Sequence, residues 1–194
     1  LLHSSNERAL TLVDVTDQTL TPMGSRMLKR WMVMPLKDKQ LIDERLDIVG
    51  YFLKESVFTE ELRKNVKNIG DLERLISKVA IGKINPREII QIKKALLSIE
   101  SIKNSFEKTA DTALHKIGEQ LNSCKLIRDR IEHDMLPDPP ALANKGNVIA
   151  SGVSDELDEL RTLAYSGKDY LLQIQQRESE KTGIPSLKIA FNNV

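Results

Sequence analysis

The stretch of sequence that decides the fold class runs from residue 85 to residue 106 and reads Asn-Pro-Arg-Glu-Ile-Ile-Gln-Ile-Lys-Lys-Ala-Leu-Leu-Ser-Ile-Glu-Ser-Ile-Lys-Asn-Ser-Phe. It opens with a helix-start signal, because Asn85 suits the N-cap, Pro86 suits the first helical position, and Glu88 completes a capping box. Apolar residues then recur every three or four positions, at Ile89, Ile92, Leu96, Ile99 and Ile102. This period places them on one face of a helix. The stretch therefore predicts a long helix that packs against other helices.

The sequence before and after this stretch continues the helical pattern. Thr21 and Pro22 repeat the N-cap and first-position signals. Asp71 is the predicted N-cap of a helix that Gly82 ends. We predict helices over residues 22–34, 38–53, 56–65, 71–81, 113–121 and 126–135. The fold class that follows is all-α, with an irregular multi-helix bundle in the first part of the chain.

A second long helix is predicted from about Ser154 to Lys181, where no proline intervenes. At about 1.5 Å per residue it would span about 40 Å, which suits a strut better than a core element. Its apolar and small residues are spaced by three and four, which is the period of a coiled-coil seam. This seam consists of Leu157, Leu160, Ala164, Gly167, Leu171 and Ile174. Leu163 and Tyr170 lie beside it, and we expect the seam to bind another helix.

Two segments interrupt the helical pattern. Three prolines within residues 137–140 break it, and we expect a loop to residue 151 that holds at most a short strand around 148–149. This loop is the best internal boundary in the chain. After the long helix, the alternation of residues 187–191 predicts the opening of a β-strand.

The composition excludes several classes of protein. The chain has 29 Lys and Arg against 28 Asp and Glu, so its net charge of +1 does not suit a strongly basic nucleic-acid module. Aromatic residues make up only 4% of the chain, which argues against a base-stacking surface. The single cysteine, Cys124, can form neither an internal disulfide nor a zinc site with only three histidines to help. No uncharged apolar run is long enough for a membrane helix, so we expect a soluble intracellular protein without a membrane partner.

The motifs that carry phosphate or metal chemistry do not fit this sequence. Gly82-Lys83 and Gly167-Lys168 lack both the upstream glycine and the following Ser or Thr of a phosphate-binding loop. The acids of residues 155–159 are better explained as helix-start residues than as metal ligands, because carboxylates favour the positive end of the helix dipole. His133 stands between two acids that should point away from it on a helix, so we expect a solvated histidine. The residues themselves therefore indicate no catalytic, cofactor-binding or metal-binding site.

The basic residues of the first predicted helix are the remaining candidates for anion binding. Arg26, Lys29 and Arg30 form a basic side of that helix. Because the chain has no overall basic excess, we expect them to pair with nearby acids such as Asp38, Asp43 or Glu44.

Several ordered segments together resemble the core region of MutS-type DNA mismatch-repair ATPases. The first covers residues 17–31, followed by Pro35-Leu36 and Arg45-Leu-Asp47. Gly70-Asp-Leu-Glu-Arg-Leu75 and Asn85-Pro-Arg87 follow in the order of that family. Residues 157–161, 182–184, 187–188 and 191–194 resemble the helix that leads to the family's DNA clamp and the first clamp strand. The chain begins at Leu1 without a methionine, so we also expect a piece of a longer protein.

The resemblance implies a mechanical role for this part of the protein. It implies a helical core or lever domain over residues 1–150, a long lever helix over 151–185, and the truncated start of the clamp over 186–194. In this family the whole protein is a homodimer that encircles double-stranded mismatched DNA and works with other mismatch-repair proteins. ATP and Mg²⁺ bind in a domain that should lie outside this chain, and the expected location is the bacterial cytoplasm, on DNA. The implied function is that of a non-catalytic lever or connector between the DNA clamp and the ATPase.

Within the chain, Lys188 is the only candidate for a DNA phosphate contact that the resemblance suggests, because it stands at the start of the clamp strand. Two other functions stay open on the sequence. One is a free-standing helical module for protein–protein interaction, and the other is the core of a MutS-like recombination relative. An enzyme with an unseen site would need a pocket lined by convergent titratable groups.

Overall fold

The computed structural model describes residues 9–189 and is all-α in that range. The chain divides into two compact units between Val148 and Ile149. The first unit contains eight α-helices among its described residues, and the second contains one long helix. The division falls after the proline-rich segment, close to the end of the predicted loop.

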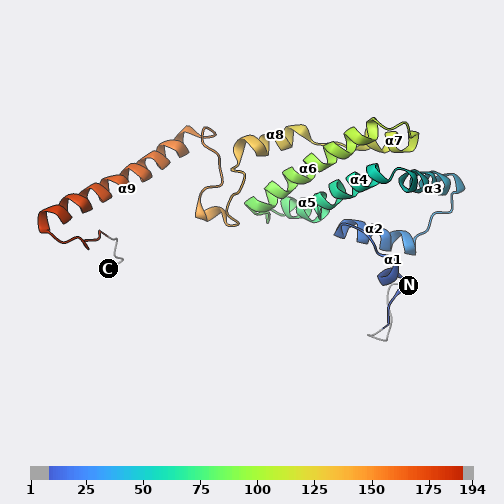
Figure 1. Cartoon of the computed structure of the whole chain (residues 1–194), viewed down its shortest axis with the longest axis horizontal. Coiled ribbons are helices and arrows are strands. Elements are labelled where there is room, and N and C mark those ends of the chain that lie inside the picture. The colour runs from blue at the N-terminus through green and yellow to red at the C-terminus, as the bar shows by residue number, and fades with distance from the viewer. Residues whose placement is uncertain (1–8, 190–194) are drawn as a thin grey trace. The chain divides into compact units, whose positions relative to one another are not determined.

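The helices of the first unit follow one another with short connections (Figure 1). Their bounds are α1 Leu12–Thr16, α2 Pro22–Val33, α3 Lys39–Lys54, α4 Ser56–Ile69, α5 Leu72–Ala80, α6 Pro86–Glu107, α7 Thr112–Gln120 and α8 Lys125–Asp134. A 3₁₀ turn, η1, spans Ala143–Lys145. Each predicted helix of this unit is confirmed, and α1 is an addition that the sequence pattern did not predict.

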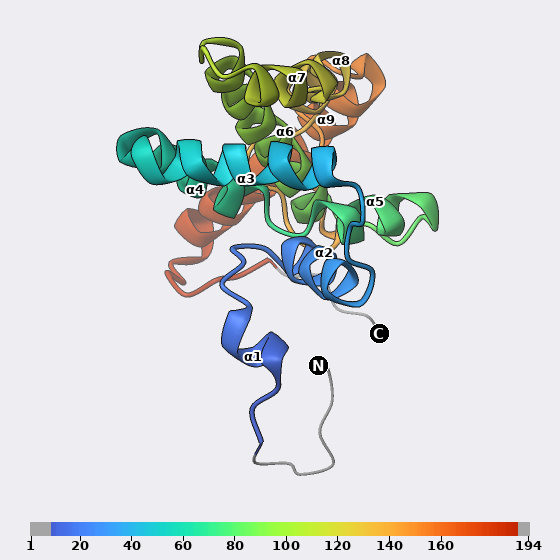
Figure 2. The ribbon, with the colours of Figure 1, turned by 90° about the vertical axis from the view of Figure 1, so that its right-hand side faces the viewer.

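Helix α6 is the centre of the first unit, and α4, α7 and α8 pack most extensively against it (Figures 1 and 2). Its predicted capping box forms: Glu88 N–H donates to Asn85 Oδ1 over 3.0 Å, and Asn85 N–H donates to Glu88 Oε2 over 3.0 Å. These bonds satisfy two of the backbone donors that a helix start leaves free. The buried residues of α6 are Pro86, Ile90, Ile92, Ala95, Leu96, Ser98, Ile102 and Phe106.

The main core cluster lies where α6 meets α7 and α4. Ile102, Phe106 and Leu114 form it, and Leu114 is fully buried. Phe58 of α4 stacks on Phe106 with 6.1 Å between the ring centroids. Gly118 of α7 allows the closest approach to α6, because a Cβ at that position would lie 3.0 Å from the Phe106 Cβ. A larger residue at 118 would therefore separate the two helices.

The proline-rich segment belongs to the first unit and is not an exposed linker. Pro139 is fully buried, and its carbonyl accepts a hydrogen bond of 3.0 Å from Arg87 Nε of α6. The short strand that the loop had room for does not form. In its place, Leu136 N–H donates to Val148 O over 2.9 Å.

Helix α2 is held to the rest of the unit by charged side chains. Arg26 binds Asp71 and Glu73 at the start of α5. The expected partners Asp38, Asp43 and Glu44 are therefore wrong for Arg26. Asp71 does occupy the predicted N-cap position of α5, but its side chain makes no capping hydrogen bond. It binds Arg26 instead, across 45 residues of sequence.

The second unit consists of α9, Asp155–Thr182, and the segments on either side of it. Its 28 residues form one uninterrupted helix that ends at Gly183, where φ is +68°. The predicted clamp strand does not form in the described residues 187–189, which have no regular structure. A strand needs a neighbour to satisfy its backbone groups, and the described residues offer none there. Residues 190–191 of that predicted strand lie outside the described residues.

Candidate interaction surface of helix α9

The start of α9 is fastened to the turn that precedes it. The Ser154 hydroxyl accepts a hydrogen bond of 3.3 Å from Leu157 N–H, so Ser154 is the N-cap of the helix. The Asp158 carboxylate accepts from Gly152 N–H over 2.6 Å and from Arg161 Nη1 over 2.8 Å. Arg161 Nη2 also donates to Ile149 O over 2.8 Å. These bonds tie the backbone of residues 149–154 to the first two turns of the helix.

The electrostatics of this turn favour a charged Asp158. The Gly152 N–H, and then the Arg161 guanidinium, lower the pKa of Asp158 below its ordinary value. Gly152 has a φ of +84°, which other residues rarely adopt, so the turn depends on glycine at this position. Among the acids at the start of α9, Asp158 is therefore the one that fastens the helix to the preceding turn.

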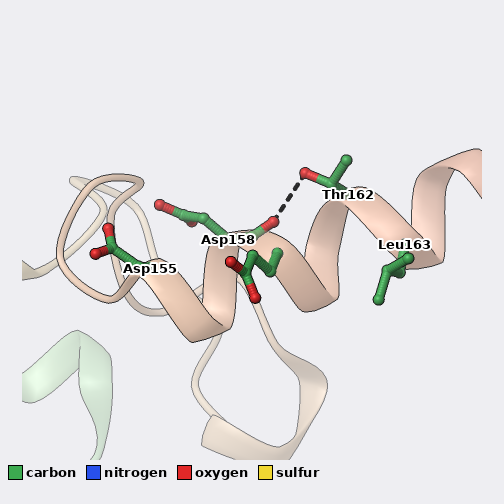
Figure 3. A pocket seen from close by; sticks show the side chains of 5 residues that line it. Asp155, Asp158, Thr162 and Leu163 are labelled. Carbon is green, nitrogen blue, oxygen red and sulfur yellow. Dashed lines mark hydrogen bonds between the residues drawn. The ribbon is translucent and has the colours of Figure 1, made fainter.

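A shallow hollow runs along the same first turns of α9 (Figure 3). Asp155, Asp158, Glu159, Thr162 and Leu163 line it, and all five come from this one helix. The Thr162 hydroxyl donates to the Asp158 carbonyl over 2.9 Å, which is a bond within the helix. The described residues contain no cluster of His, Cys, Asp or Glu with the arrangement of a metal site. The hollow is a groove along a helix surface and gathers no convergent groups.

The predicted seam lies on one side of α9 and is mostly exposed to solvent. Leu160 and Leu171 are 57% and 50% exposed, although leucine is usually buried in folded proteins. Leu157 and Ile174, near the two ends of the seam, are partly covered. Ala164 and Gly167, in the middle, are exposed. The binding of another helix to this seam stays a prediction.

Gly167 is unusual because nothing in the structure requires a glycine there. It lies in the interior of α9, and a Cβ at this position would meet no atom within 4 Å. Glycine costs about 1 kcal/mol relative to alanine inside a helix. A neighbouring helix that approaches closely would account for the small residue, since Ala164 lies one turn before it on the same side.

Other apolar residues of α9 lie beside and opposite the seam. Leu163 and Tyr170, which the sequence placed beside it, are 67% and 64% exposed. Tyr165 and Leu172 are 65% and 54% exposed, and they lie outside the predicted seam. Their spacing of seven residues places them on one line along the helix. The same spacing in the sequence would have identified them as a second apolar line. The described part of α9 therefore carries exposed apolar residues on more than one side of the helix.

The remaining candidate residues are spread over the chain. Lys188 is exposed in the segment after α9, and its predicted contact with DNA stays a prediction. Gly82 belongs to the turn that ends α5, where Lys83 N–H donates to Lys78 O over 2.9 Å and Gly82 N–H donates to Val79 O over 3.0 Å. Gly167-Lys168 lies inside α9, where a helical backbone cannot wrap a phosphate.

His133 is exposed as expected, but its Nδ1 lies 2.8 Å from Asp134 Oδ1, so the neighbouring acid does not point away.

No helix among residues 9–189 combines the length and the apolar character that crossing a membrane requires.

Comparison with known proteins assigns the whole chain to one kind of protein. Residues 1–187 match the protein family described as MutS domain III. Over all 194 residues the chain is 57% identical to the DNA mismatch repair protein MutS of Parabacteroides distasonis and 57% identical to that of Phocaeicola vulgatus. It is 46% identical to the MutS of Porphyromonas gingivalis. The chain spans about a fifth of the length of these relatives, namely 22%.

Proposed function

Because this chain belongs to the MutS family of DNA mismatch-repair proteins, as its domain III, we propose that it is the non-catalytic lever that couples the DNA clamp to the ATPase in mismatch repair. The observation that carries the proposal is α9, a single helix of 28 residues with a fastened start. At 1.5 Å per residue it is about 42 Å long, which is the distance over which it can transmit a displacement.

Two features of α9 suit a lever. Its backbone hydrogen bonds run without interruption from Asp155 to Thr182, so the helix resists compression along its axis. Its first turns are tied to the preceding backbone by Asp158 and Arg161, so a movement of residues 149–154 is passed to the helix. A helix with a loose start would lose part of that movement in its first turn.

The exposed seam supports a lever built from more than one helix. In this proposal the partner of the seam is another segment of the same mismatch-repair protein, which packs closely at Ala164 and Gly167. That partner would bury Leu160 and Leu171, each of which contributes about 1.5–3 kcal/mol when it is transferred from water to a packed interior. The family match favours this assignment over a free-standing interaction module or a recombination relative.

The proposed regions of the chain are the three that the family resemblance implies. Residues 1–150 form the helical core, 151–185 the lever helix, and 186–194 the start of the clamp, whose first strand forms when its neighbours are present. Lys188 lies at that start and contacts a DNA phosphate. ATP and Mg²⁺ bind in another domain of the parent protein, which acts on mismatched double-stranded DNA in the bacterial cytoplasm as a homodimer with other mismatch-repair proteins.

The test is to break the lever inside the whole protein. Three glycines inserted after Gly167 interrupt α9 and rotate its second half relative to the first. We expect ATP hydrolysis without DNA to stay within about twofold, while the change that mismatched DNA causes in that rate falls by about tenfold, which is the size of a typical coupling between sites. Equilibrium binding of a mismatched duplex is measured in parallel.

The matched control is the same insertion after Gly82, in the turn between α5 and α6. A Cβ at Gly82 would meet no atom within 4 Å, so the turn has room, and residues 149–154 and α9 stay unchanged. This variant should keep its response to DNA. A normal response in the Gly167 insertion, or an equal loss in both variants, contradicts the lever.

A further inference from the structure

Helices α1 and α2, which belong to the first unit, contact each other through side chains. The Ser25 hydroxyl donates to Asp17 Oδ2 over 2.5 Å, and the Thr16 hydroxyl lies 3.9 Å from the Met32 sulfur. The two helices are therefore bound to each other. We call residues 11–33, which carry both, the strap.

The strap is attached to the other helices by few contacts. No residue of α2 is fully buried, and Met27 and Trp31 of its apolar side are 53% and 44% exposed. Near its C-terminal end, Arg45 of α3 lies over the Trp31 ring at 3.8 Å from the centroid. Near its N-terminal end, Arg26 reaches the start of α5. Arg26 is thus the attachment farthest from the covalent connection to α3.

The guanidinium of Arg26 is used almost completely in this attachment. Its Nη1 and Nη2 donate to the two carboxylate oxygens of Asp71 over 3.1 and 2.6 Å. Its Nε and Nη2 donate to Glu73 Oε2 over 3.0 and 2.6 Å. Two-pronged pairing of this kind is specific in its geometry, and lysine cannot reproduce it. The pair is partly exposed, so dissolved salt weakens it.

Asp71 has a second use available, at the N-cap position of α5. The N-cap side chain of a helix ordinarily accepts a hydrogen bond from the second or third backbone N–H, which here belong to Glu73 and Arg74. Asp71 makes no such bond, and both of its oxygens accept from Arg26 instead. Its carboxylate nevertheless lies close to the Arg74 N–H, which adds to the lowering of the Asp71 pKa that Arg26 causes. A small rotation of the side chain would complete the cap.

We propose that the strap is held by a two-position latch, in which Asp71 either binds Arg26 and closes the strap or caps α5 and releases it. When Asp71 leaves Arg26 and caps α5, the new capping hydrogen bond offsets part of the free energy that is lost with the ion pair. The strap can therefore open without unfolding α5, and the rest of the helical core stays intact. Salt, or any anion that competes for the Arg26 guanidinium, shifts the latch toward the open position.

The test measures amide hydrogen exchange by NMR in this 194-residue chain. Arg26→Gln should speed exchange in residues 23–33 by about tenfold, while the amides of Glu73 and Arg74 exchange at the same rate or more slowly. Sodium chloride should speed exchange of residues 23–33 in the unmodified chain and have little effect in the variant. Arg30→Gln is the matched control, because it removes the same charge from α2 at a residue without an ion pair among the described side chains.

A second pair of variants tests the two positions of Asp71. Asp71→Asn removes the ion pair and keeps a side chain that can cap, so the strap should open while the start of α5 stays protected. Asp71→Ala removes both, so exchange should be faster in the strap than in the unmodified chain, and faster at Glu73 and Arg74 than in Asp71→Asn. The proposal is overturned if Arg26→Gln leaves strap exchange equal to that of Arg30→Gln. It is also overturned if Arg26→Gln speeds the Glu73 and Arg74 amides as much as Asp71→Ala does.

Discussion

Helices α6 and α9 are the two longest in the chain, with 22 and 28 residues, and they differ in what covers them. Helix α6 begins with a complete capping box and buries eight residues among its neighbours. Helix α9 begins with an equally well-fastened turn, yet none of its described side chains is fully buried. Local sequence signals therefore build both helices, whereas burial depends on packing partners, which the described residues of the first unit supply for α6.

The two helices obtain their stability in different ways. Most helical stability in proteins comes from the packing of an apolar face, not from the helix itself. Helix α6 has that packing, so it should be stable with the first unit. Helix α9 depends on its propensity, its fastened start and the partner we propose for its seam.

The core of the first unit should be the part of the chain that is most sensitive to substitution. Leu114 is fully buried against α6, so Leu114→Ala should lower the free energy of unfolding by about 2–5 kcal/mol. Leu171→Ala makes the same change on α9, where the side chain is 50% exposed, and should alter it by less than about 0.5 kcal/mol. Urea denaturation of both variants measures the two values. Similar losses would show that α9 is packed in solution.

The second effect is on local opening. Amides in residues 90–106 should exchange at rates near those of global unfolding, and amides in 165–181 should exchange at least about a hundredfold faster. The reason is that opening α9 exposes little apolar surface that is not already in water. Hydrogen exchange with mass spectrometry of the isolated chain gives both rates in one experiment. Equal protection of the two segments in a monomer would contradict the contrast.

The sequence predicted the helices well because their signals are local. Asn85 and Glu88 form the predicted capping box, and Gly82 and Gly183 end helices in the conformation that favours glycine. The MutS family membership, which rests on ordered motifs, is also confirmed. Helix α1 was missed because its five residues are too short to show a helical period.

What the sequence could not supply are contacts between distant residues. Arg26 was expected to pair with acids at the start of the next helix, and it binds Asp71 and Glu73 instead, while Asp71 keeps its predicted N-cap position without a capping hydrogen bond. The predicted strand after α9 does not form in residues 187–189, because strand formation depends on a neighbouring strand. The seam of α9 was found from its period, but no local signal identifies its partner.

The third prediction concerns pH and the start of α9. The folded-state pKa of Asp158 is lowered, so its bonds stabilise the turn at pH values above the unfolded pKa of about 3.9 and are lost as pH falls through the lower folded value. The Gly152 amide, which donates to Asp158, should report this loss as a change of NMR chemical shift on acidification. Asp158→Asn should remove that transition. Asp155→Asn, which removes a charge from the same helix turn, should leave it unchanged. A Gly152 transition that persists in Asp158→Asn would assign it to another group.

Substitution of Leu160 and Leu171 tests the seam most directly. Of all the changes proposed, it should disturb the folding of the chain least. Exposed apolar stripes on isolated domains tend to find a partner, and a second α9 in antiparallel orientation about a twofold axis is the simplest one available to the isolated chain. We expect the unmodified chain to form a dimer at high concentration in sedimentation experiments. Leu160→Glu with Leu171→Glu should give a monomer whose free energy of unfolding differs by less than about 0.5 kcal/mol per site, because both side chains are at least half exposed.

Tyr165→Glu with Leu172→Glu is the matched control on the other side of α9, and it should leave the dimer intact. An unmodified chain that stays monomeric, or a dimer that only the control variant disrupts, would show that the seam does not bind a second copy of α9.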